Sequence, residues 1–412
     1  MIMGRLLKKL GLGLLLAILV VGALNFKSLQ RLVRVNAMFD ADEIVYNFSH
    51  LHELMQSTEL VASGTPHIWP VDIQPLPETY VTHGDTKNVA AALENLQTTA
   101  LVVVKDGTII FEDYYKGTQA DDLRISWSMS KSFVSALTGL AIANGDIADI
   151  NDPVTKYVPM LAKSGYNDVP LVDVMNMASG VKFNEDYLDF NSDINKMGRV
   201  LALGGSLDKF SASIVETNRA SGEAWQYVSI DTHVISMVLR AATGETLQDY
   251  FVENLWSKIG ASANAYYLED KKGNAFALGG LMVRTRDYAL FGELFRNGGK
   301  RGDVQIIPAD WVAQSTAQSA PPPAGGNAED HAKGEMYGYQ WWLPSNSDGE
   351  FFAVGIYGQF IYINPKAGIV IAKNAAHREF MEAGEYGDGS HKTNMDLFRA
   401  IAEHYSDWET SQ

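Results

Sequence analysis

The sequence predicts an α+β fold in which one antiparallel sheet is completed by segments from both ends of the chain. Asp106-Gly107 joins two β-rich runs and is a strong hairpin signal, because a type I′ turn needs a positive φ at both central residues. Residues from about 146 to 270 show little strand character, so we expect a helical subdomain beside the sheet. The β-rich runs are 99–105, 108–115, 340–343, 351–364 and 368–374.

The helices are predicted from apolar periodicity and from the residues that end it. The pattern from 128 to 143 is helical and stops at Asn144-Gly145, a typical C-terminal signal. Residues 319–333 contain Pro321-Pro322-Pro323 and are predicted as a loop. The other predicted helices cover 39–60, 284–297 and 394–404.

The N-terminal segment predicts export. Arg5, Lys8 and Lys9 precede an uncharged, mostly apolar run over residues 10–26, which is the pattern of a secretory signal. At 17 residues the run is intermediate between a signal sequence and the roughly 20 residues of a membrane span. A cleaved signal and a retained anchor in a bacterial inner membrane both stay open, and either places the rest of the chain in the periplasm.

Three regions follow from these patterns. Residues 1–26 form the signal or anchor, and the Pro-punctuated residues 27–95 are expected to be an arm packed on the main domain. Residues 96–412 form that domain and include the helical subdomain. The oligomeric state is not predicted by these patterns.

Composition excludes several classes of function. The 412 residues are 46% hydrophobic and 20% charged, which is typical of a globular protein. A net charge of −16 argues against a nucleic-acid partner, which needs a basic surface. The absence of cysteine excludes disulfides, zinc–thiolate sites and thiol nucleophiles. No metal-binding motif occurs, since His50 and His52 lack helical ligand spacing, so we expect no metal and no other cofactor.

Two Ser-x-x-Lys pairs are candidates for covalent catalysis, Ser128 with Lys131 and Ser206 with Lys209. On a helix this spacing places both side chains on one face, where a neutral lysine can take the serine proton. Ser128 begins a long apolar helix, which favours it as the nucleophile. The alternative is that Ser128 only caps this helix and that Lys131 is exposed to solvent; the spacing of the two residues would then be the same. Ser206 follows two glycines and precedes Asp208, which is typical of a helix N-cap.

Several motifs together resemble one family. The stretch 126–133, Ser-Trp-Ser-Met-Ser-Lys-Ser-Phe, resembles the nucleophile motif of the penicillin-recognising serine hydrolases. It is most similar to the class C β-lactamase branch, which includes the 6-aminohexanoate-dimer (nylon-oligomer) hydrolases. Further matching stretches are 145–153, 177–181, 222–229 and 279–288, so that the resemblance runs from about residue 65 to 374.

The resemblance implies the β-lactamase/penicillin-binding-protein-like fold and a set of site residues. Ser128 would be the nucleophile, and Lys131 and Tyr227 would share the acid–base work. Ser229 would support their hydrogen bonds. Tyr187 would be a loop tyrosine that contacts the scissile amide, although a plain acidic surface loop around it stays open.

The third motif departs from that of the β-lactamases, which carry Lys-Thr/Ser-Gly on the strand lining the site. Here the stretch reads Gly355-Ile356-Tyr357-Gly358, as in the nylon-oligomer-type hydrolases. The backbone N–H of Ile356 would still pair with that of Ser128 as an oxyanion hole, which needs no particular side chain. The cation that holds a substrate carboxylate is missing, unless Arg284 or Lys373 replaces it. Lys392-Thr393-Asn394 resembles the motif only superficially, because we expect it in a loop before the last helix.

These observations predict an exported serine hydrolase that acts without a cofactor through an acyl-enzyme on Ser128. Its substrate would be a small ester, an amide or a short oligomer. A penicillin-binding D,D-peptidase or a β-lactamase is the alternative within enzymes. A catalytically idle sensor that binds peptide-like ligands is the alternative outside them.

Overall fold

The computed structural model describes residues 37–324, 335–344, 348–379 and 389–410, together with isolated positions between 10 and 26. Most of the predicted signal or anchor segment therefore lies outside the described residues. Within the described part, no helix combines the length and the hydropathy that crossing a membrane requires.

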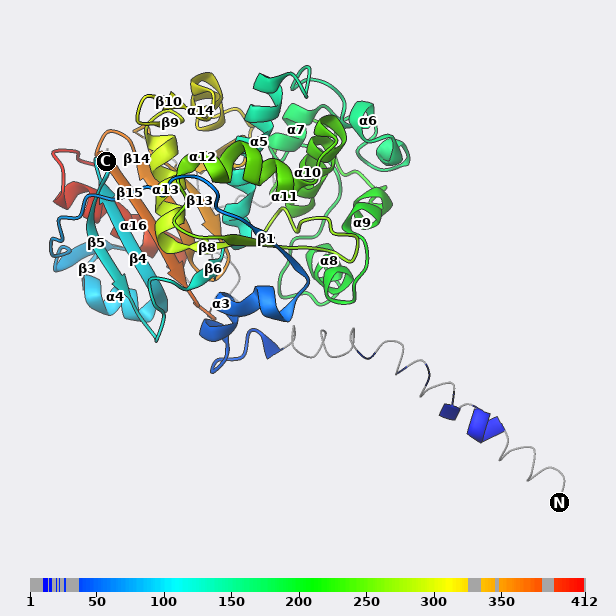
Figure 1. Cartoon of the computed structure of the whole chain (residues 1–412), viewed down its shortest axis with the longest axis horizontal. Helices are drawn as coiled ribbons and strands as arrows, with labels where there is room; N and C mark the ends of the chain where they lie inside the picture. Colours follow the sequence, from blue (N-terminus) through cyan, green and yellow to red (C-terminus); the bar gives the residue numbers. More distant parts are fainter. Residues whose placement is uncertain are drawn as a thin grey trace.

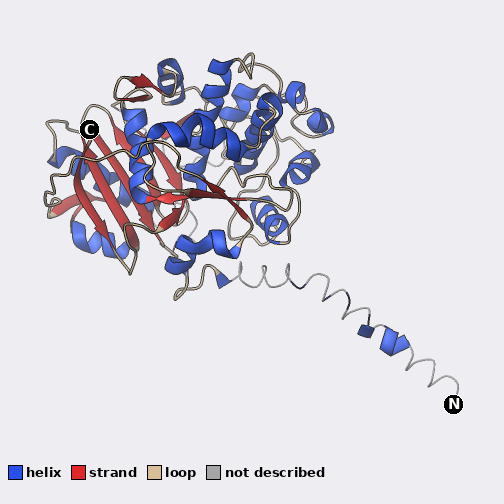
Figure 2. Ribbon diagram, in the orientation of Figure 1, coloured by secondary structure: helices blue, strands red, loops and turns tan. Residues whose placement is uncertain are grey.

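A seven-stranded antiparallel sheet forms one half of the molecule (Figures 1 and 2). Its strand order is β11-β12-β13-β14-β15-β4-β5, so the N-terminal hairpin β4-β5 pairs with the last C-terminal strand, β15. This arrangement confirms the α+β prediction. The strands are β4 (Thr98–Lys105), β5 (Thr108–Tyr114), β11 (Met336–Gly338), β12 (Trp341–Leu343), β13 (Phe351–Gly355), β14 (Gln359–Asn364) and β15 (Ile369–Ala375).

The hairpin turn has the predicted geometry. Asp106 has a φ of 45° and Gly107 a φ of 78°, both in the left-handed region that a type I′ turn requires. Lys105 pairs with Thr108 across the turn, and the register of the two strands shifts between Val103 and Val104.

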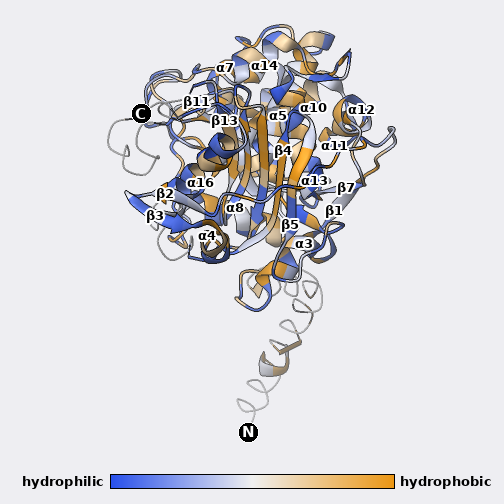
Figure 3. Cartoon of the chain, turned by 90° about the vertical axis from the view of Figure 1, so that its left-hand side faces the viewer, coloured by the Kyte–Doolittle hydropathy of each residue, from blue (hydrophilic) through white to orange (hydrophobic). Residues whose placement is uncertain are grey.

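Helices cover both faces of the main sheet, which explains why its central strands are apolar on both sides (Figure 3). Helix α13 (Thr285–Arg296) packs on one face, close enough that a Cβ on its Gly292 would lie 2.6 Å from Val370. Helix α16 (Ser390–His404) packs on the other face, where the ring of Phe398 lies 5.3 Å from that of Phe360.

The helical subdomain forms the other half (Figure 1). Its long helix α10 packs against α5, the helix that follows Ser128. The helices of this half are α5 (Ser130–Asn144), α6 (Val154–Tyr157), α7 (Leu171–Met175), α8 (Asp193–Ala202), α9 (Leu207–Ser213), α10 (Ser229–Thr243), α11 (Leu247–Phe251) and α12 (Ser257–Ile259). Other elements are α3 (Ile44–Leu54), α4 (Val89–Asn95), α14 (Ala309–Ser315) and the small strand pairs β2 (Thr79–Thr82) with β3 (Asp85–Asn88) and β9 (Lys300–Arg301) with β10 (Val304–Gln305).

A second antiparallel sheet has the order β1-β7-β8-β6, and its strand β6 leads directly to Ser128. The prediction of a single helix over 39–60 is therefore wrong at its C-terminal end, because α3 ends at Leu54 and strand β1 begins at Ser57. Strand β1 gains its hydrogen bonds from β7, more than 200 residues away in the sequence, which no local pattern reveals. The strands are β1 (Ser57–Leu60), β6 (Leu123–Ile125), β7 (Ala265–Leu268) and β8 (Leu281–Arg284).

Two further predicted loops differ in how the structure describes them. Lys392-Thr393-Asn394 lies in the first turns of α16 and not in a loop, since that helix begins at Ser390. The predicted loop over 319–333 is described only as far as residue 324.

Candidate active site

Ser128 and Lys131 are brought together at the junction between β6 and α5. A single 3₁₀ turn, η1 (Trp127–Met129), connects the two elements and carries Ser128. The Nζ of Lys131 donates a hydrogen bond to Ser128 Oγ at 2.8 Å and another to the carbonyl of Leu278 at 3.2 Å. Lys131 is only 2% exposed, so it is not the solvated lysine of the N-cap alternative.

The residue before Ser128 has an unusual backbone. Trp127 has a φ of 43°, a conformation that costs a non-glycine residue roughly 1–3 kcal/mol and that is concentrated at functional sites. Aromatic packing holds the ring in place, with centroids of Phe39, Phe48 and Tyr357 at 6.1, 5.6 and 6.0 Å. The surrounding packing therefore stabilises the turn that presents Ser128.

Tyr227 and Ser229 reach the same place from the start of α10. The Nζ of Lys131 lies over the ring of Tyr227, 4.9 Å from its centroid. The ring is buried and stacks on Trp342 at 5.5 Å. The structure therefore brings Ser128, Lys131 and Tyr227 into one cluster, while their catalytic roles stay predictions.

Glu185 is a site residue that the sequence analysis missed. Its carboxylate accepts hydrogen bonds from the backbone N–H of Ser229 at 3.0 Å, from Ser229 Oγ, and from the hydroxyl of Tyr187 at 3.0 Å. Burial raises the pKa of Glu185, and the positive charge of Lys131 and the bonds from Ser229 oppose that rise. One signal in the sequence could have indicated that Glu185 belongs to the site. Glu185 is two residues from Tyr187, and residues two apart in an extended chain point to the same side.

Gly355 allows the end of β13 to lie directly against the turn that carries Ser128. A Cβ at this position would lie 2.3 Å from the carbonyl oxygen of Ser126 and 3.1 Å from the nitrogen of Ser128. Only glycine fits such an approach. Ile356, the next residue, lines the same cavity as Ser128, as the predicted oxyanion hole requires.

The cavity beside Ser128 has a volume of about 550 Å³ and mostly apolar walls. Ser128, Ser229, Tyr187 and Ile356 all line it. Helix α8 forms one wall, and Met38 and Phe39 from the N-terminal arm contribute to another. The apolar side chains that line it further include Met55, Leu188, Phe190, Ile194, Met197, Leu201, Phe276 and Leu278.

Neither cation that the sequence analysis considered lines this cavity. Arg284 pairs with Asp121 at 2.9 Å. Lys373 is buried in β15, with its Nζ 3.4 Å from the carbonyl of Gly358, and burial lowers its pKa to about 7. Arg199 of α8 is instead the one formally charged residue among those described that line the cavity.

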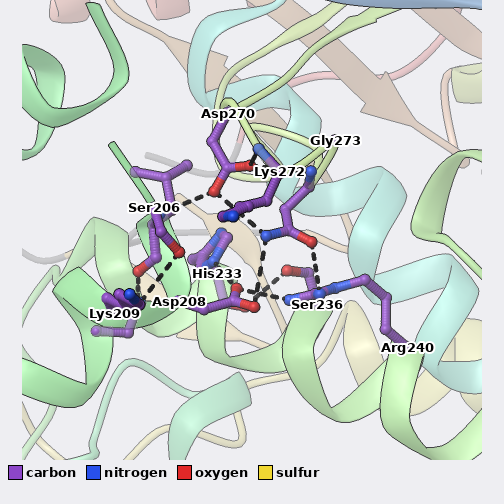
Figure 4. Close-up of polar contacts among 12 residues, drawn as sticks. Ser206, Asp208, Lys209, His233, Ser236, Arg240, Asp270, Lys272 and Gly273 are labelled. Carbon is purple, nitrogen blue, oxygen red and sulfur yellow. Dashed lines mark hydrogen bonds and ion pairs between the residues drawn. The ribbon is translucent and has the colours of Figure 1, made fainter. Parts of the chain in front are cut away.

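The second Ser-x-x-Lys pair has a structural role, as predicted (Figure 4). Ser206 is the N-cap of α9 and accepts a hydrogen bond from the backbone of Lys209 at 3.4 Å. Asp208 bonds instead to His233 at 2.8 Å and to Arg240 at 2.7 Å. No group of three potential metal ligands occurs among the described residues.

The sequence profile of the family described as Beta-lactamase matches residues 86–389. A 6-aminohexanoate-dimer hydrolase of Paenarthrobacter ureafaciens is 30% identical over 287 residues, which cover 68% of this chain and 73% of that protein.

Solved structures that share the fold include two hydrolases. One is described as a putative 6-aminohexanoate-dimer hydrolase from Bacillus anthracis. It superimposes with a TM-score of 0.77 at 23% identity, over 89% of this chain and 95% of its own. A family VIII carboxylesterase superimposes with a TM-score of 0.57 at 18% identity, over 76% of this chain and 95% of its own.

Proposed function

Because the chain belongs to the beta-lactamase family, we propose that it is a serine hydrolase that cleaves small esters or amides through an acyl-enzyme on Ser128. Membership confirms the resemblance inferred from the motifs. The observation that carries the proposal is the 2.8 Å contact between Lys131 Nζ and Ser128 Oγ beside an apolar cavity. The names of the relative and of the carboxylesterase support both leaving-group types, since one denotes an amide hydrolase and the other an esterase.

In the proposed acylation step, Lys131 as a neutral amine accepts the proton of Ser128 while Oγ attacks the substrate carbonyl carbon. The carbonyl oxygen becomes an oxyanion, which the N–H groups of Ser128 and Ile356 stabilise. Tyr227 gives a proton to the leaving alcohol or amine as its bond to the carbonyl carbon breaks. The Lys131 ammonium then returns its proton to Tyr227, so both groups begin the second half-reaction as they began the first. A water molecule attacks the acyl carbon while Lys131 takes one of its protons; the bond from the acyl carbon to Ser128 Oγ breaks, Oγ receives that proton, and the acyl group leaves as a carboxylic acid.

Glu185 would keep this arrangement in place. By accepting both hydrogen bonds of Ser229 it fixes the start of α10, and hence Tyr227 two residues earlier. Its negative charge also favours the ammonium that Lys131 becomes after it has taken the serine proton. Tyr187, held by the same carboxylate, presents its side chain at the cavity.

Two alternatives are distinguished by activity. A β-lactamase or D,D-peptidase would bind the carboxylate next to its scissile amide, which the Gly355-Ile356-Tyr357-Gly358 stretch has no cation to hold. Rapid turnover of nitrocefin would support this alternative, whereas we expect neutral short-chain esters to be better substrates. An idle sensor would show neither activity.

The location outside the cytoplasm is part of the proposal. Its support is the basic segment before the apolar run of residues 10–26. Fractionation of cells that make the full chain should place the protein in the periplasm or on the inner membrane. Recovery in the cytoplasm would contradict the export.

The reaction itself is tested by substituting the two serines of the Ser-x-x-Lys pairs. With p-nitrophenyl butyrate as substrate, Ser128→Ala should lose at least about a thousandfold in kcat, because no other nucleophile replaces the serine. Ser206→Ala should keep its rate within a few-fold, since that serine caps α9. A Ser128→Ala variant with wild-type turnover would refute the proposal.

A further inference from the structure

Among the described side chains that line the cavity beside Ser128, formal charge of only one sign occurs. Its lining includes Arg199 and no Asp, Glu or Lys among the described residues. This holds although the chain as a whole carries a net charge of −16. A positive charge on a mostly apolar wall is therefore a specific feature of the site.

Arg199 is held in a fixed place on that wall. Its Nη1 donates to the carbonyl of Phe190 at 2.8 Å, and its guanidinium lies over the ring of Phe190, 4.1 Å from the centroid. Phe190 also lines the cavity and is 70% exposed. Stacking and this single hydrogen bond orient the planar guanidinium before any ligand arrives.

The guanidinium keeps donors for a ligand. Its hydrogen bond to Phe190 uses one of five N–H groups, and no described carboxylate forms an ion pair with it. The nearest acidic residue on the same helix, Asp193, pairs with Lys196 at 3.0 Å. The remaining N–H groups match the paired oxygens of a carboxylate.

We propose that Arg199 selects substrates in which an apolar chain ends in a carboxylate, such as monoesters of dicarboxylic acids or esters of hydroxy acids. The inference rests on the proposed function, because Ser128 must cleave the ester. The apolar side chains of the cavity would cover the methylene chain, and Arg199 would bind its anionic end. A chain that ends in an ammonium group, as a 6-aminohexanoyl group does, finds no carboxylate on this lining.

Matched substrates test the sign of the preferred charge. One series places the charge on the acyl side, in p-nitrophenyl monoesters of adipate, hexanoate and 6-(trimethylammonio)hexanoate. A second series places it on the alcohol side, in butyrate esters of 6-hydroxyhexanoate, hexanol and a 6-(trimethylammonio)hexanol. In at least one series kcat/KM should follow the order anionic, neutral, cationic.

The Arg199→Gln variant should lower the ratio of anionic to neutral kcat/KM in that series by about tenfold or more, as expected for a charge-assisted hydrogen bond. The neutral ester should change little, because the lost interaction involves only the charged end. Lys196→Gln is the matched control, since Lys196 lies on the same helix, pairs with Asp193 and does not line the cavity. It should leave all ratios unchanged.

A binding measurement separates this inference from the proposed reaction. In the Ser128→Ala background, the intact anionic ester of at least one of the two series should bind more tightly than its neutral analogue, and Arg199→Gln should remove the difference. That result would support the inference even if the wild type hydrolysed neither ester, in which case the proposed function alone would fail. Equal ratios in wild type and Arg199→Gln across both series, with equal binding, would overturn the inference.

Discussion

Replacing Gly355 by alanine would disturb the oxyanion hole without changing any side chain that takes part in the reaction. The new Cβ would lie 2.3 Å from the carbonyl oxygen of Ser126, closer than real Cβ contacts allow. The gap must widen to at least 3.0 Å, which is a shift of about 0.7 Å between β13 and the Ser128 turn. Both proposed oxyanion donors, the N–H groups of Ser128 and Ile356, lie on the two segments that would separate.

The expected loss follows from the size of this shift. An oxyanion donor that moves by most of an ångström contributes little to the transition state, and losing one donor costs about 10²- to 10³-fold in kcat. Misplacements of about 1 Å are known to cost about a hundredfold. We therefore expect kcat for p-nitrophenyl butyrate to fall by about a hundredfold, with KM changed much less, because the cavity walls keep their side chains.

Gly64→Ala is the matched control. A Cβ at Gly64 would lie 2.0 Å from the carbonyl oxygen of Ser257, a clash of the same kind outside the residues that line the cavity. For both variants, kcat is calculated per folded molecule, with the folded fraction measured by near-UV circular dichroism. This comparison separates a displaced oxyanion hole from a general loss of stability. A Gly355→Ala enzyme with more than a third of the wild-type kcat would refute the proposed position of the oxyanion hole.

Two further predictions concern the partly buried carboxylates of Glu185 and Asp208. Glu185→Gln should lower kcat about tenfold and should change the acidic limb of the kcat/KM profile, because burial raises the pKa of Glu185 and the uncharged amide resembles the protonated carboxyl group that forms as the pH falls; an unchanged profile would show that the carboxylate has no part in the chemistry. Burial alone would raise the pKa of Asp208, but His233 and Arg240 hold it at about 2. A depressed pKa contributes stability above the unfolded value of about 3.9, so at pH 7 Asp208→Asn should lower the free energy of unfolding by about 2 kcal/mol. Urea denaturation should show that difference shrinking as the pH falls from 4 toward 2, and a difference independent of pH would contradict the ion-pair account.

Local sequence signals predicted the parts of this fold that depend on neighbouring residues. The turn at Asp106-Gly107 and the cap at Ser206 are encoded within a few residues, because positive φ and N-capping are properties of short segments. The Ser128–Lys131 contact was also predictable, since the 3₁₀ turn that carries Ser128 continues directly into α5 and keeps two side chains three residues apart on one side.

The features that were missed depend on distant pairing. Strand β1 forms because β7 lies beside it, and Glu185 becomes a site residue only when its loop meets the start of α10. Arg199 was not singled out, since an arginine on an amphipathic helix is ordinary until the walls of the cavity beside it are known to be mostly apolar. Arg284 and Lys373 were considered because of their position in the sequence, and tertiary structure directs both away from the cavity.

Covalent labelling is the most direct test of the central claim that Ser128 is an activated nucleophile. A fluorophosphonate probe transfers its phosphonyl group to such a serine with loss of fluoride, and intact-protein mass spectrometry counts the adducts. The wild type and Ser206→Ala should each gain one phosphonyl group, located by peptide mapping on Ser128, whereas Ser128→Ala should gain none. Labelling that persists in Ser128→Ala, or a wild type that stays unlabelled, would contradict the account.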